Sequence, residues 1–379
     1  MSQADVVIAA GGTAGHMLPA IALADELSSR GVAKSAIAFV GSGRGLEDSI
    51  FRGSGYRIIK FKGRGIPRKS PWGIVRSIWS NLIATIEILP ALMALRPKVV
   101  ISFGGYYSVL PALLGRFEGA QVVTIEQNAV LGMANRVVAN FSQALCVPPF
   151  FVNENGSNKP VVIGNPLRKQ AAEISMSQTP PRLEVRATLG FDAEDFVVLC
   201  FGGSLGATFL NELMVSLVPM LKKGISVVHI SGERDFDKSH LAAEGADLFG
   251  PGYQLRAYDP DLYWLIYAAD LVICRSGAST IAELAAFGTP AIFVPLPNAP
   301  DDHQNENAKA IAQKGGALVI DQAELDPAKL AETINELADD SKTLSKMAEA
   351  ISGFAVLDAT ERTADVITPF LDLSESRGQ

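Results

Sequence analysis

Short apolar runs alternate with amphipathic helical patterns along the whole chain. Five runs in the first half are predicted as buried strands: residues 6–10, 36–40, 99–103, 122–125 and 144–147. The second half repeats the pattern over residues 196–200, 227–230, 271–274 and 291–294. Apolar residues at helical spacing fall between the strands, notably over residues 18–29, 211–221 and 280–287. This alternation predicts an α/β fold with parallel sheets.

Two domains are expected from the length of 379 residues and from an internal repeat. VVIAAGGTAG at 6–15 resembles VVLCFGGSLG at 197–206, and each is a strand that leads through a glycine loop into a helix. Residues 166–195 contain two consecutive prolines and few apolar residues, which is typical of a connection. We expect one domain over 1–164 and another over 165–356, with the terminal helix, 357–379, packing back on the first.

Charge divides unevenly between the halves of the chain. Residues 1–165 carry 16 Lys and Arg against 9 Asp and Glu, whereas the remainder carries 17 against 31, for a net charge of −7. The basic half is therefore expected to face an anionic partner. Three cysteines each end an apolar run, which predicts buried thiols in a reducing compartment. Neither a signal peptide nor a membrane-spanning helix is predicted.

Each glycine loop places backbone amides at the start of a helix, where phosphate binds. Neither loop continues into Gly-Lys-[Ser/Thr], and the acidic residue of a dinucleotide fold is missing after the second strand. Two loops of this kind indicate two phosphate-bearing ligands, although a tight strand–helix turn also needs glycine. His16 ends the first loop, where the helix dipole favours a neutral imidazole. It is either a general base or a capping or packing residue.

Two polar stretches in the second half are candidates for sugar and nucleotide binding. In RSGASTIAE at 275–283, Glu283 either binds a ribose diol or completes a capping box with Thr280. DDHQNEN at 301–307 either clamps sugar hydroxyls or starts a helix. Asp301, Asp302 and His303 form only a weak metal pattern, so no metal cofactor is expected.

Residues 60–86 combine six basic residues with interleaved Trp and Ile and contain no acidic residue. This pattern is typical of a segment that lies on an anionic membrane surface. It also fits a core-facing helix preceded by a basic loop. Membrane contacts are expected from Arg68, Lys69, Trp72, Arg76 and Trp79.

Seven motifs occur in an order that resembles the bacterial N-acetylglucosaminyltransferases that convert lipid I to lipid II in peptidoglycan synthesis. They are GGTAGH at 11–16, SFGGYYS at 102–108, EQN at 126–128, GNPLR at 164–168, GGSLGA at 202–207, RSGASTIAE at 275–283 and DHQNENA at 302–308. The resemblance spans nearly the whole chain. It implies a GT-B architecture of two Rossmann-like domains with parallel sheets, acting without a metal as a peripheral protein on the cytoplasmic face of the membrane.

The resemblance also implies partners and residue roles, with UDP-GlcNAc as donor, lipid I as acceptor and no nucleic acid. The inverting reaction joins GlcNAc to the C4 hydroxyl of the muramyl sugar. Donor contacts are expected from Thr13, Gly15, Asn128, Arg168, Ser204, Glu283 and Gln304. Acceptor contacts are expected from Gly11, Gly12, Gly104, Gly105, Tyr106 and Gln127. His16 and Glu126 are both candidates for the catalytic base, and the sequence does not choose between them.

Three positions depart from the family pattern. Leu205 stands where the family often has Gln, Ile125 replaces a common His, and the loop at 297–300 lacks the usual His. Two alternatives remain open at this point: another GT-B glycosyltransferase acting on a glycolipid or natural product, and a nucleotide-sugar-binding protein without activity. A nicotinamide dehydrogenase is disfavoured by the glycine spacing.

Overall fold

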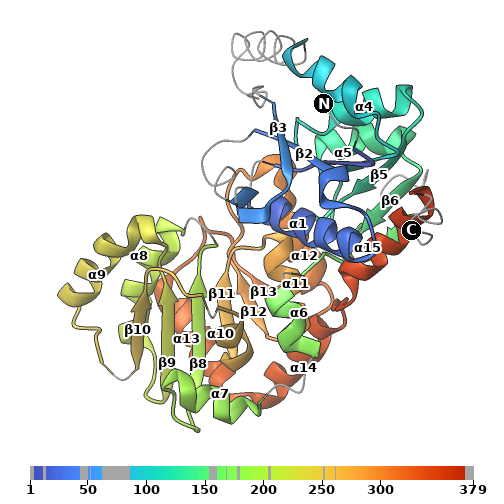
Figure 1. Cartoon of the computed structure of the whole chain (residues 1–379). Helices are drawn as coiled ribbons and strands as arrows, with labels where there is room; N and C mark the ends of the chain where they lie inside the picture. Colours follow the sequence, from blue (N-terminus) through green and yellow to red (C-terminus); the bar gives the residue numbers. More distant parts are fainter. Residues whose placement is uncertain are drawn as a thin grey trace. The chain divides into compact units, whose positions relative to one another are not determined.

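The computed structural model divides into two compact units, Met1–Arg168 with Asp358–Gln379 and Lys169–Leu357 (Figure 1). The residues it describes are 4–11, 14–42, 50–51, 53–61, 86–152, 160–167, 169–176, 180–203, 206–250, 252–260 and 262–371.

The first unit is built on a seven-stranded parallel sheet in the order β3-β2-β1-β4-β5-β6-β7. Its strands are β1 (Val6–Ala9), β2 (Ile37–Gly41), β3 (Arg57–Lys60), β4 (Val99–Ser102), β5 (Gln121–Ile125), β6 (Ala144–Val147) and β7 (Val161–Val162). The strand order reverses between β1 and β4. The carboxyl ends of strands at such a reversal are where open α/β sheets bind ligands.

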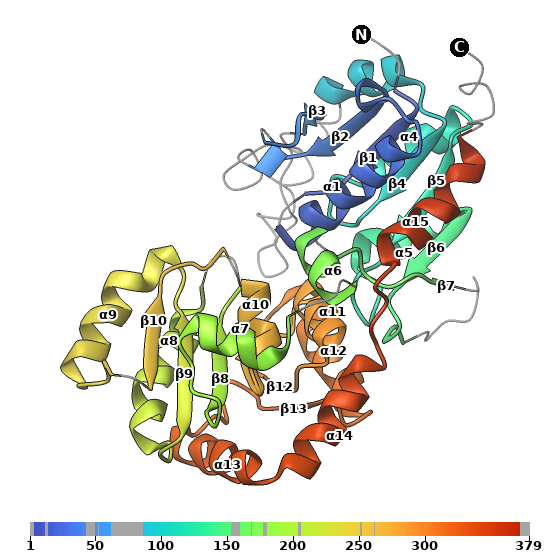
Figure 2. The ribbon, with the colours of Figure 1, turned by 60° about the horizontal axis from the view of Figure 1, so that its bottom comes forward.

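Helices cover both faces of this sheet because alternate residues of each strand point to opposite sides. Val6 and Ile8 pack with α1 (Ala14–Ser29) and α15 (Ala359–Ile367), whereas Val7 and Ala9 pack with α4 (Val109–Phe117) and residues 86–95. α15 lies beside α1 in both views (Figures 1 and 2). Further helical segments of this unit are α5 (Met133–Val138), η1 (Lys34–Ala36), η2 (Ala139–Phe141) and η6 (Thr368–Phe370).

The second unit repeats the arrangement with a six-stranded parallel sheet in the order β10-β9-β8-β11-β12-β13. Its strands are β8 (Phe196–Phe201), β9 (Ile225–Ile230), β10 (Tyr253–Arg256), β11 (Leu271–Cys274), β12 (Ala291–Phe293) and β13 (Ala317–Val319). The order reverses between β8 and β11. A second ligand-binding edge is therefore expected at the carboxyl ends of these two strands.

The described part of the second unit contains nine α-helices. They are α6 (Lys169–Met176), α7 (Arg182–Leu189), α8 (Thr208–Leu217), α9 (Phe236–Gly245), α10 (Leu262–Ala268), α11 (Ala278–Phe287), α12 (His303–Ala312), α13 (Pro327–Asp339) and α14 (Ser341–Ser352). Three 3-10 turns join them: η3 (Val218–Met220), η4 (Glu233–Asp235) and η5 (Pro300–Asp302). One face of the sheet packs on α8, α13 and α14 through a cluster that includes Leu210, Ile334 and Met347.

All nine predicted strands are confirmed to within two residues at each end. The three cysteines are buried, as expected. The prediction that residues 166–195 are a simple connection is wrong, because this stretch contains α6 and α7. Ala171 and Ile174 of α6 are buried, and Val185 of α7 is buried too. These two short helices each offer only a few apolar residues, too few to give a clear helical stripe.

Candidate functional site

His16 lies in the first turn of α1, directly after the first glycine loop. Its Nδ1 atom is 3.3 Å from the carbonyl oxygen of Gly11. Because a carbonyl only accepts, this bond places the proton of the neutral ring on Nδ1 and makes Nε2 its basic nitrogen. The half-buried imidazole thus has its lone pair on Nε2.

Pro19 lies inside α1 and has no N–H to donate to the carbonyl of Gly15, four residues earlier. Gln127 supplies a donor instead, with its Nε2 3.1 Å from that oxygen. Because Gln127 follows β5, this bond joins the start of α1 to the loop after β5. No pattern in the sequence indicated this link.

Glu126 organises the loop after β5 and is only 3% exposed. Its Oε1 accepts from the backbone N–H groups of Gln127 and Asn128, both at 3.0 Å, and from Asn128 Nδ2 at 2.9 Å. Its Oε2 accepts from the Gly132 N–H and from Asn135 Nδ2, both at 3.0 Å. Five donors therefore compensate one buried carboxylate.

The loop after β4 is shaped by two consecutive glycines. Gly104 and Gly105 have φ values of 88° and 78°, which favour glycine. Ser102 Oγ accepts from the Gly104 N–H at 3.3 Å and donates to Asn135 Oδ1 at 2.9 Å. The loops after β1, β4 and β5 thus bring nine predicted site residues to one edge of the first sheet: Gly11, Gly15, His16, Gly104, Gly105, Tyr106, Glu126, Gln127 and Asn128.

In the second unit, the glycine loop after β8 is tightly packed at two positions. A Cβ on Gly202 would lie 2.4 Å from the backbone nitrogen of Ala207, and one on Gly206 would lie 2.2 Å from the carbonyl oxygen of Ser231. Gly203 differs, because among the described residues nothing lies within 4 Å of its Cβ position. The path of this loop into α8 therefore requires glycine at 202 and 206 for lack of space.

A buried histidine of β9, two residues before Ser231, links this strand to α8 and β10. His229 Nε2 is 2.9 Å from Asn211 Oδ1, and its Nδ1 is 2.8 Å from the Tyr253 hydroxyl. Asn211 Nδ2 in turn donates to the carbonyl of Ser231 at 3.0 Å. Burial lowers the pKa of His229 to about 4, so the ring is neutral at physiological pH.

The stability of the second unit is expected to fall as the pH drops from about 6.5 to about 4. An unfolded histidine binds a proton near the upper value, whereas folded His229 does so only near the lower one. Acid therefore favours the unfolded state, with a loss of up to about 3 kcal/mol. Thermal midpoints measured across this range should depend less on pH in His229→Gln than in the wild type. Equal pH slopes in the two proteins would contradict the expectation.

Glu283 lies one turn into α11, which begins at Ala278 with Gly277 as its N-cap and no capping side chain. The capping-box interpretation is therefore wrong, since Thr280 lies inside the helix rather than at the N-cap. Glu283 is 5% exposed, and the Tyr263 hydroxyl donates to its Oε1 at 3.3 Å. Nothing in the sequence pattern linked this tyrosine of α10 to the site.

Gln304 lies in the first turn of α12, so the 301–307 stretch does start a helix. Its Oε1 accepts from the Leu296 N–H at 2.9 Å, and its backbone carbonyl accepts from Ser276 Oγ at 2.7 Å. Asn307 Nδ2 donates to the Ser276 carbonyl at 3.1 Å. These bonds tie α12 to the loop after β11 and fix the amide of Gln304 with Nε2 as its donor.

Nine predicted site residues lie outside the described residues: Gly12, Thr13, Arg68, Lys69, Trp72, Arg76, Trp79, Arg168 and Ser204. Within the described part of the chain, no group of three or more His, Cys, Asp and Glu side chains is placed to hold a metal. No helix in that part is both long and apolar enough to cross a membrane.

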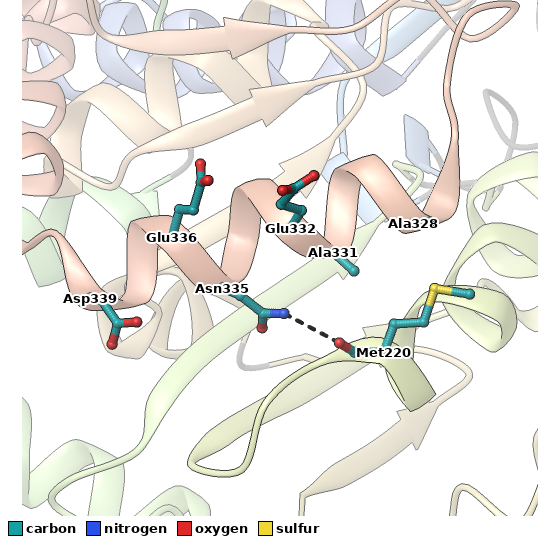
Figure 3. A pocket seen from close by; sticks show the side chains of 7 residues that line it. All are labelled: Met220, Ala328, Ala331, Glu332, Asn335, Glu336 and Asp339. Carbon is teal, nitrogen blue, oxygen red and sulfur yellow. Dashed lines mark hydrogen bonds between the residues drawn. The ribbon is translucent and has the colours of Figure 1, made fainter.

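A groove of about 380 Å³ lies between η3 and α13 of the second unit (Figure 3). Glu332, Glu336 and Asp339 line it, and Asn335 Nδ2 donates to the Met220 carbonyl at 3.2 Å. α8 starts at the carboxyl edge of the sheet and runs back, so η3, which follows it, lies at the amino edge. The groove is therefore at the opposite end of this sheet from the glycine loop, and none of the predicted site residues lines it.

Comparisons with known proteins account for both units. Residues 6–147 match the glycosyltransferase family 28 N-terminal domain, and residues 197–363 match the glycosyltransferase family 28 C-terminal domain. The chain belongs to glycosyltransferase family 28. It is therefore a hexosyltransferase, and the resemblance inferred from the seven motifs is confirmed.

Relatives of this glycosyltransferase match it over nearly their whole length. It is 34% identical over 371 residues to the UDP-N-acetylglucosamine--N-acetylmuramyl-(pentapeptide) pyrophosphoryl-undecaprenol N-acetylglucosamine transferase of Geobacter metallireducens, covering 95% of this chain and 97% of that protein. It is 35% identical over 364 residues to the protein of the same name from Acidothermus cellulolyticus, covering 96% of each.

Solved structures confirm the predicted architecture of this glycosyltransferase. The crystal structure of Acinetobacter baumannii MurG has a TM-score of 0.73 at 27% identity, covering 97% of this chain and 99% of that one. The calicheamicin glycosyltransferase CalG4 has a TM-score of 0.67 at 16% identity, covering 98% and 99%. This second likeness bears on the fold alone. The fold is GT-B, with two parallel-sheet α/β domains.

Proposed function

We propose that this protein transfers N-acetylglucosamine from UDP-GlcNAc to the C4 hydroxyl of the muramyl sugar of lipid I, which gives lipid II and UDP. The observation that carries the proposal is the full-length similarity to transferases whose name states an N-acetylglucosaminyl transfer onto a muramyl-pyrophosphoryl-undecaprenol. The similarity to natural-product glycosyltransferases is lower, at 16% identity, and supports a shared fold only.

We assign donor binding chiefly to the domain at 165–356. UDP leaves as an anion, so positive charge and backbone amides are needed to receive it. Arg168, Ser204 and the second glycine loop are proposed for this role, with Glu283 on the ribose diol. Contacts to the sugar and its phosphates are proposed from Thr13, Gly15, Asn128 and Gln304. The Nε2 donor of Gln304, fixed by Leu296, supports a hydrogen bond to a sugar hydroxyl.

We assign the general base to His16. Its Nε2 takes the proton of the C4 hydroxyl while that oxygen bonds to C1 of GlcNAc. The bond from C1 to the phosphate oxygen breaks, and its electron pair leaves with UDP. The sugar passes through an oxocarbenium-like state. Attack opposite to UDP converts an α-linked donor into a β-linked product. The tautomer that Gly11 selects supports this assignment.

Acceptor binding is assigned to the domain at 1–164 with the helix at 357–379. The contacts are proposed from Gly11, Gly12, Gly104, Gly105, Tyr106 and Gln127. Gln127 is 2% exposed, and no described residue donates to its Oε1. An oxygen atom that is buried without a hydrogen-bond donor costs about 1–3 kcal/mol. A hydroxyl group of bound lipid I would supply that donor and recover this free energy. No step of the reaction uses a metal.

Transfer of labelled GlcNAc from UDP-GlcNAc to a lipid I analogue tests the proposal directly. A labelled product with one more sugar, together with released UDP, is the expected result. UDP-GlcNAc binding without transfer would indicate a binding protein. Transfer to another glycolipid but not to the lipid I analogue would indicate a different GT-B enzyme.

Glu283→Gln is expected to weaken UDP-GlcNAc binding while the fold is retained. A carboxylate that accepts from a ribose hydroxyl contributes about 1.5–3 kcal/mol, which corresponds to roughly 10- to 100-fold in the dissociation constant. Calorimetric titration with UDP-GlcNAc measures it, and Glu212→Gln, on an exposed ion pair with Lys238, is the control. Unchanged donor affinity in folded Glu283→Gln would rule out the ribose contact.

We further propose that the protein binds an anionic membrane surface at the cytoplasmic face. The basic segment at 60–86 precedes two helices that carry exposed apolar side chains. Ile86 is 63% exposed and Phe117 of α4 is 90% exposed. Both helices pack on the same face of the first sheet. Apolar and basic side chains combined in one part of the sequence support binding at a lipid surface.

Replacing Arg68, Lys69 and Arg76 by Ser is expected to release the protein from anionic vesicles. Each basic residue near such a surface contributes about 1 kcal/mol, and salt screens the attraction. Vesicle co-sedimentation at low and high salt measures the effect. Turnover of a short-chain soluble acceptor should stay at the wild-type level. Vesicle binding that responds to neither the substitutions nor salt would exclude this contact surface.

A further inference from the structure

A continuous buried chain of hydrogen bonds connects the loop after β4 to the loop after β5. The Gly104 N–H donates to Ser102 Oγ, and that hydroxyl donates to Asn135 Oδ1. Asn135 Nδ2 then donates to Glu126 Oε2 and to the Ile125 carbonyl, both at 3.0 Å. Asn135 is 2% exposed and Ser102 is 0% exposed, so water does not replace these bonds easily.

The direction of every bond in this chain is fixed by chemistry. The Ile125 carbonyl and the Glu126 carboxylate only accept, so the amide of Asn135 must turn its NH₂ toward them. Its oxygen therefore faces Ser102, whose hydroxyl must donate to it. The hydroxyl oxygen is then oriented to accept from Gly104. One asparagine side chain thus dictates the geometry of both loops.

The same contacts limit the ability of the Glu126 carboxylate to act as a base. A carboxylate offers about four lone-pair positions, and five donors already surround that of Glu126. Taking a proton from a substrate would require breaking bonds that hold the loop. Its position therefore suits an anchor of the loop better than a base.

A second link extends the unit to the start of α1. Gln127 follows Glu126 directly, and its Nε2 binds the Gly15 carbonyl that Pro19 leaves without its helical donor. The Asn165 side chain also donates to the Gln127 carbonyl at 2.9 Å. The three loops that carry Gly11, Gly104 and Gln127 are therefore fastened together by side chains.

We propose that Asn135, with Ser102 as its partner, is a positioning residue that acts through Glu126 to hold the acceptor-binding loops in the geometry of the reaction. The role rests on the proposed function, because it concerns acceptor binding. Neither residue is proposed to touch the substrate. A misplacement of about 1 Å costs on the order of 100-fold in rate, so a small shift of these loops has a large effect.

Asn135→Asp keeps the shape of the side chain but turns an oxygen toward Glu126 and the Ile125 carbonyl. We expect the acceptor kcat/KM to fall roughly 10- to 100-fold with a raised acceptor KM, while UDP affinity, assigned chiefly to the domain at 165–356, changes much less. Ser102→Ala should move the same constants in the same direction by less. The control is Asn140→Asp, an exposed asparagine that follows α5 and lies outside this network.

Combining Asn135→Asp with Glu126→Gln tests whether the hydrogen bond between these two side chains works in the reverse direction, from residue 126 to residue 135. The new amide of residue 126 can then donate to the new carboxylate, so the double variant should exceed the activity that the two single effects predict together. A merely structural role would instead lower the thermal midpoint and the active fraction, leaving the acceptor KM unchanged. That result, or wild-type kinetics in Asn135→Asp, would overturn the proposal.

Hydrogen exchange gives a readout that needs no substrate. Amides over 103–108 and 126–132 should exchange faster in Asn135→Asp than in the wild type and in Asn140→Asp. If the wild type transfers no GlcNAc to the lipid I analogue, the proposed function fails while the exchange still decides whether Asn135 locks the loops. Unchanged amide exchange rates in both segments would show that Asn135 does not hold the two loops in place.

Discussion

His16→Ala is expected to lose roughly 10²–10⁴-fold in kcat, because positioned proton transfer contributes about that much. The Nδ1–Gly11 bond leaves Nε2 as the basic nitrogen of a neutral ring, and alanine has no replacement for it. UDP affinity should be retained, since the glycine loop and Glu283 proposed to bind it belong to the other domain. Steady-state kinetics with a lipid I analogue and calorimetry with UDP measure both quantities. His240→Ala, on exposed α9, is the matched control.

The alternative makes His16 a hydrogen-bond donor to the lipid diphosphate and Glu126 the base. Loss of a uniform phosphate contact raises the acceptor KM and leaves kcat intact, whereas loss of a base lowers kcat. A pure KM effect in His16→Ala would therefore reject our assignment. Glu126→Gln should disturb acceptor binding as well as turnover, because it places a donor amide against donors of its own loop.

Gly206→Ala is expected to destabilise the second domain by roughly 3 kcal/mol or more and to abolish tight UDP binding. The new methyl would lie 2.2 Å from the Ser231 carbonyl oxygen, and the backbone at this position has φ 72°. Moving the loop to relieve the contact would displace the amides at the start of α8, which are proposed to receive the diphosphate. Thermal midpoints and UDP calorimetry measure the two effects.

Gly203→Ala separates crowding from backbone strain in the same loop. Gly203 has φ 89°, but no described atom lies within 4 Å of its Cβ position. Alanine there should cost only the left-handed penalty of about 1–2 kcal/mol. Equal losses at the two positions would mean that backbone conformation alone sets the requirement for glycine.

The sequence predicted the central strands of both sheets and missed the strands at their edges. β1, β4, β8 and β11 are covered by helices on both faces and have nearly continuous apolar sequences. β3, β7, β10 and β13 each have a neighbour on one side only and are partly exposed. Polar residues such as Arg57 interrupt β3 and β10, whereas β7 and β13 are only two and three residues long. A pattern of apolar residues along the sequence reflects burial, and an edge strand is buried too little to have a clear pattern.

The candidate site residues also divide into those that the sequence indicates and those that it does not. Candidates in glycine loops or dense polar motifs, such as His16 and Glu283, could be proposed from the sequence because their neighbours mark them. Asn135 and Tyr263 could not, because each contacts a candidate residue from a different helix, at a contact that only the folded chain creates. No local pattern distinguishes such residues from ordinary helix positions.

The first unit cannot complete its hydrophobic core until the C-terminal part of the chain has been synthesised. Ala364, Ile367 and Leu371 belong to the same buried cluster as Leu23 and Leu27 of α1. On the ribosome, residues 1–168 emerge well before α15, so one face of their sheet is covered by α1 but not by α15 while the whole second unit is synthesised. Domains usually fold in the order in which they are made. Here the second unit can complete its fold first, and a chain that stops before residue 358 would leave the first one open.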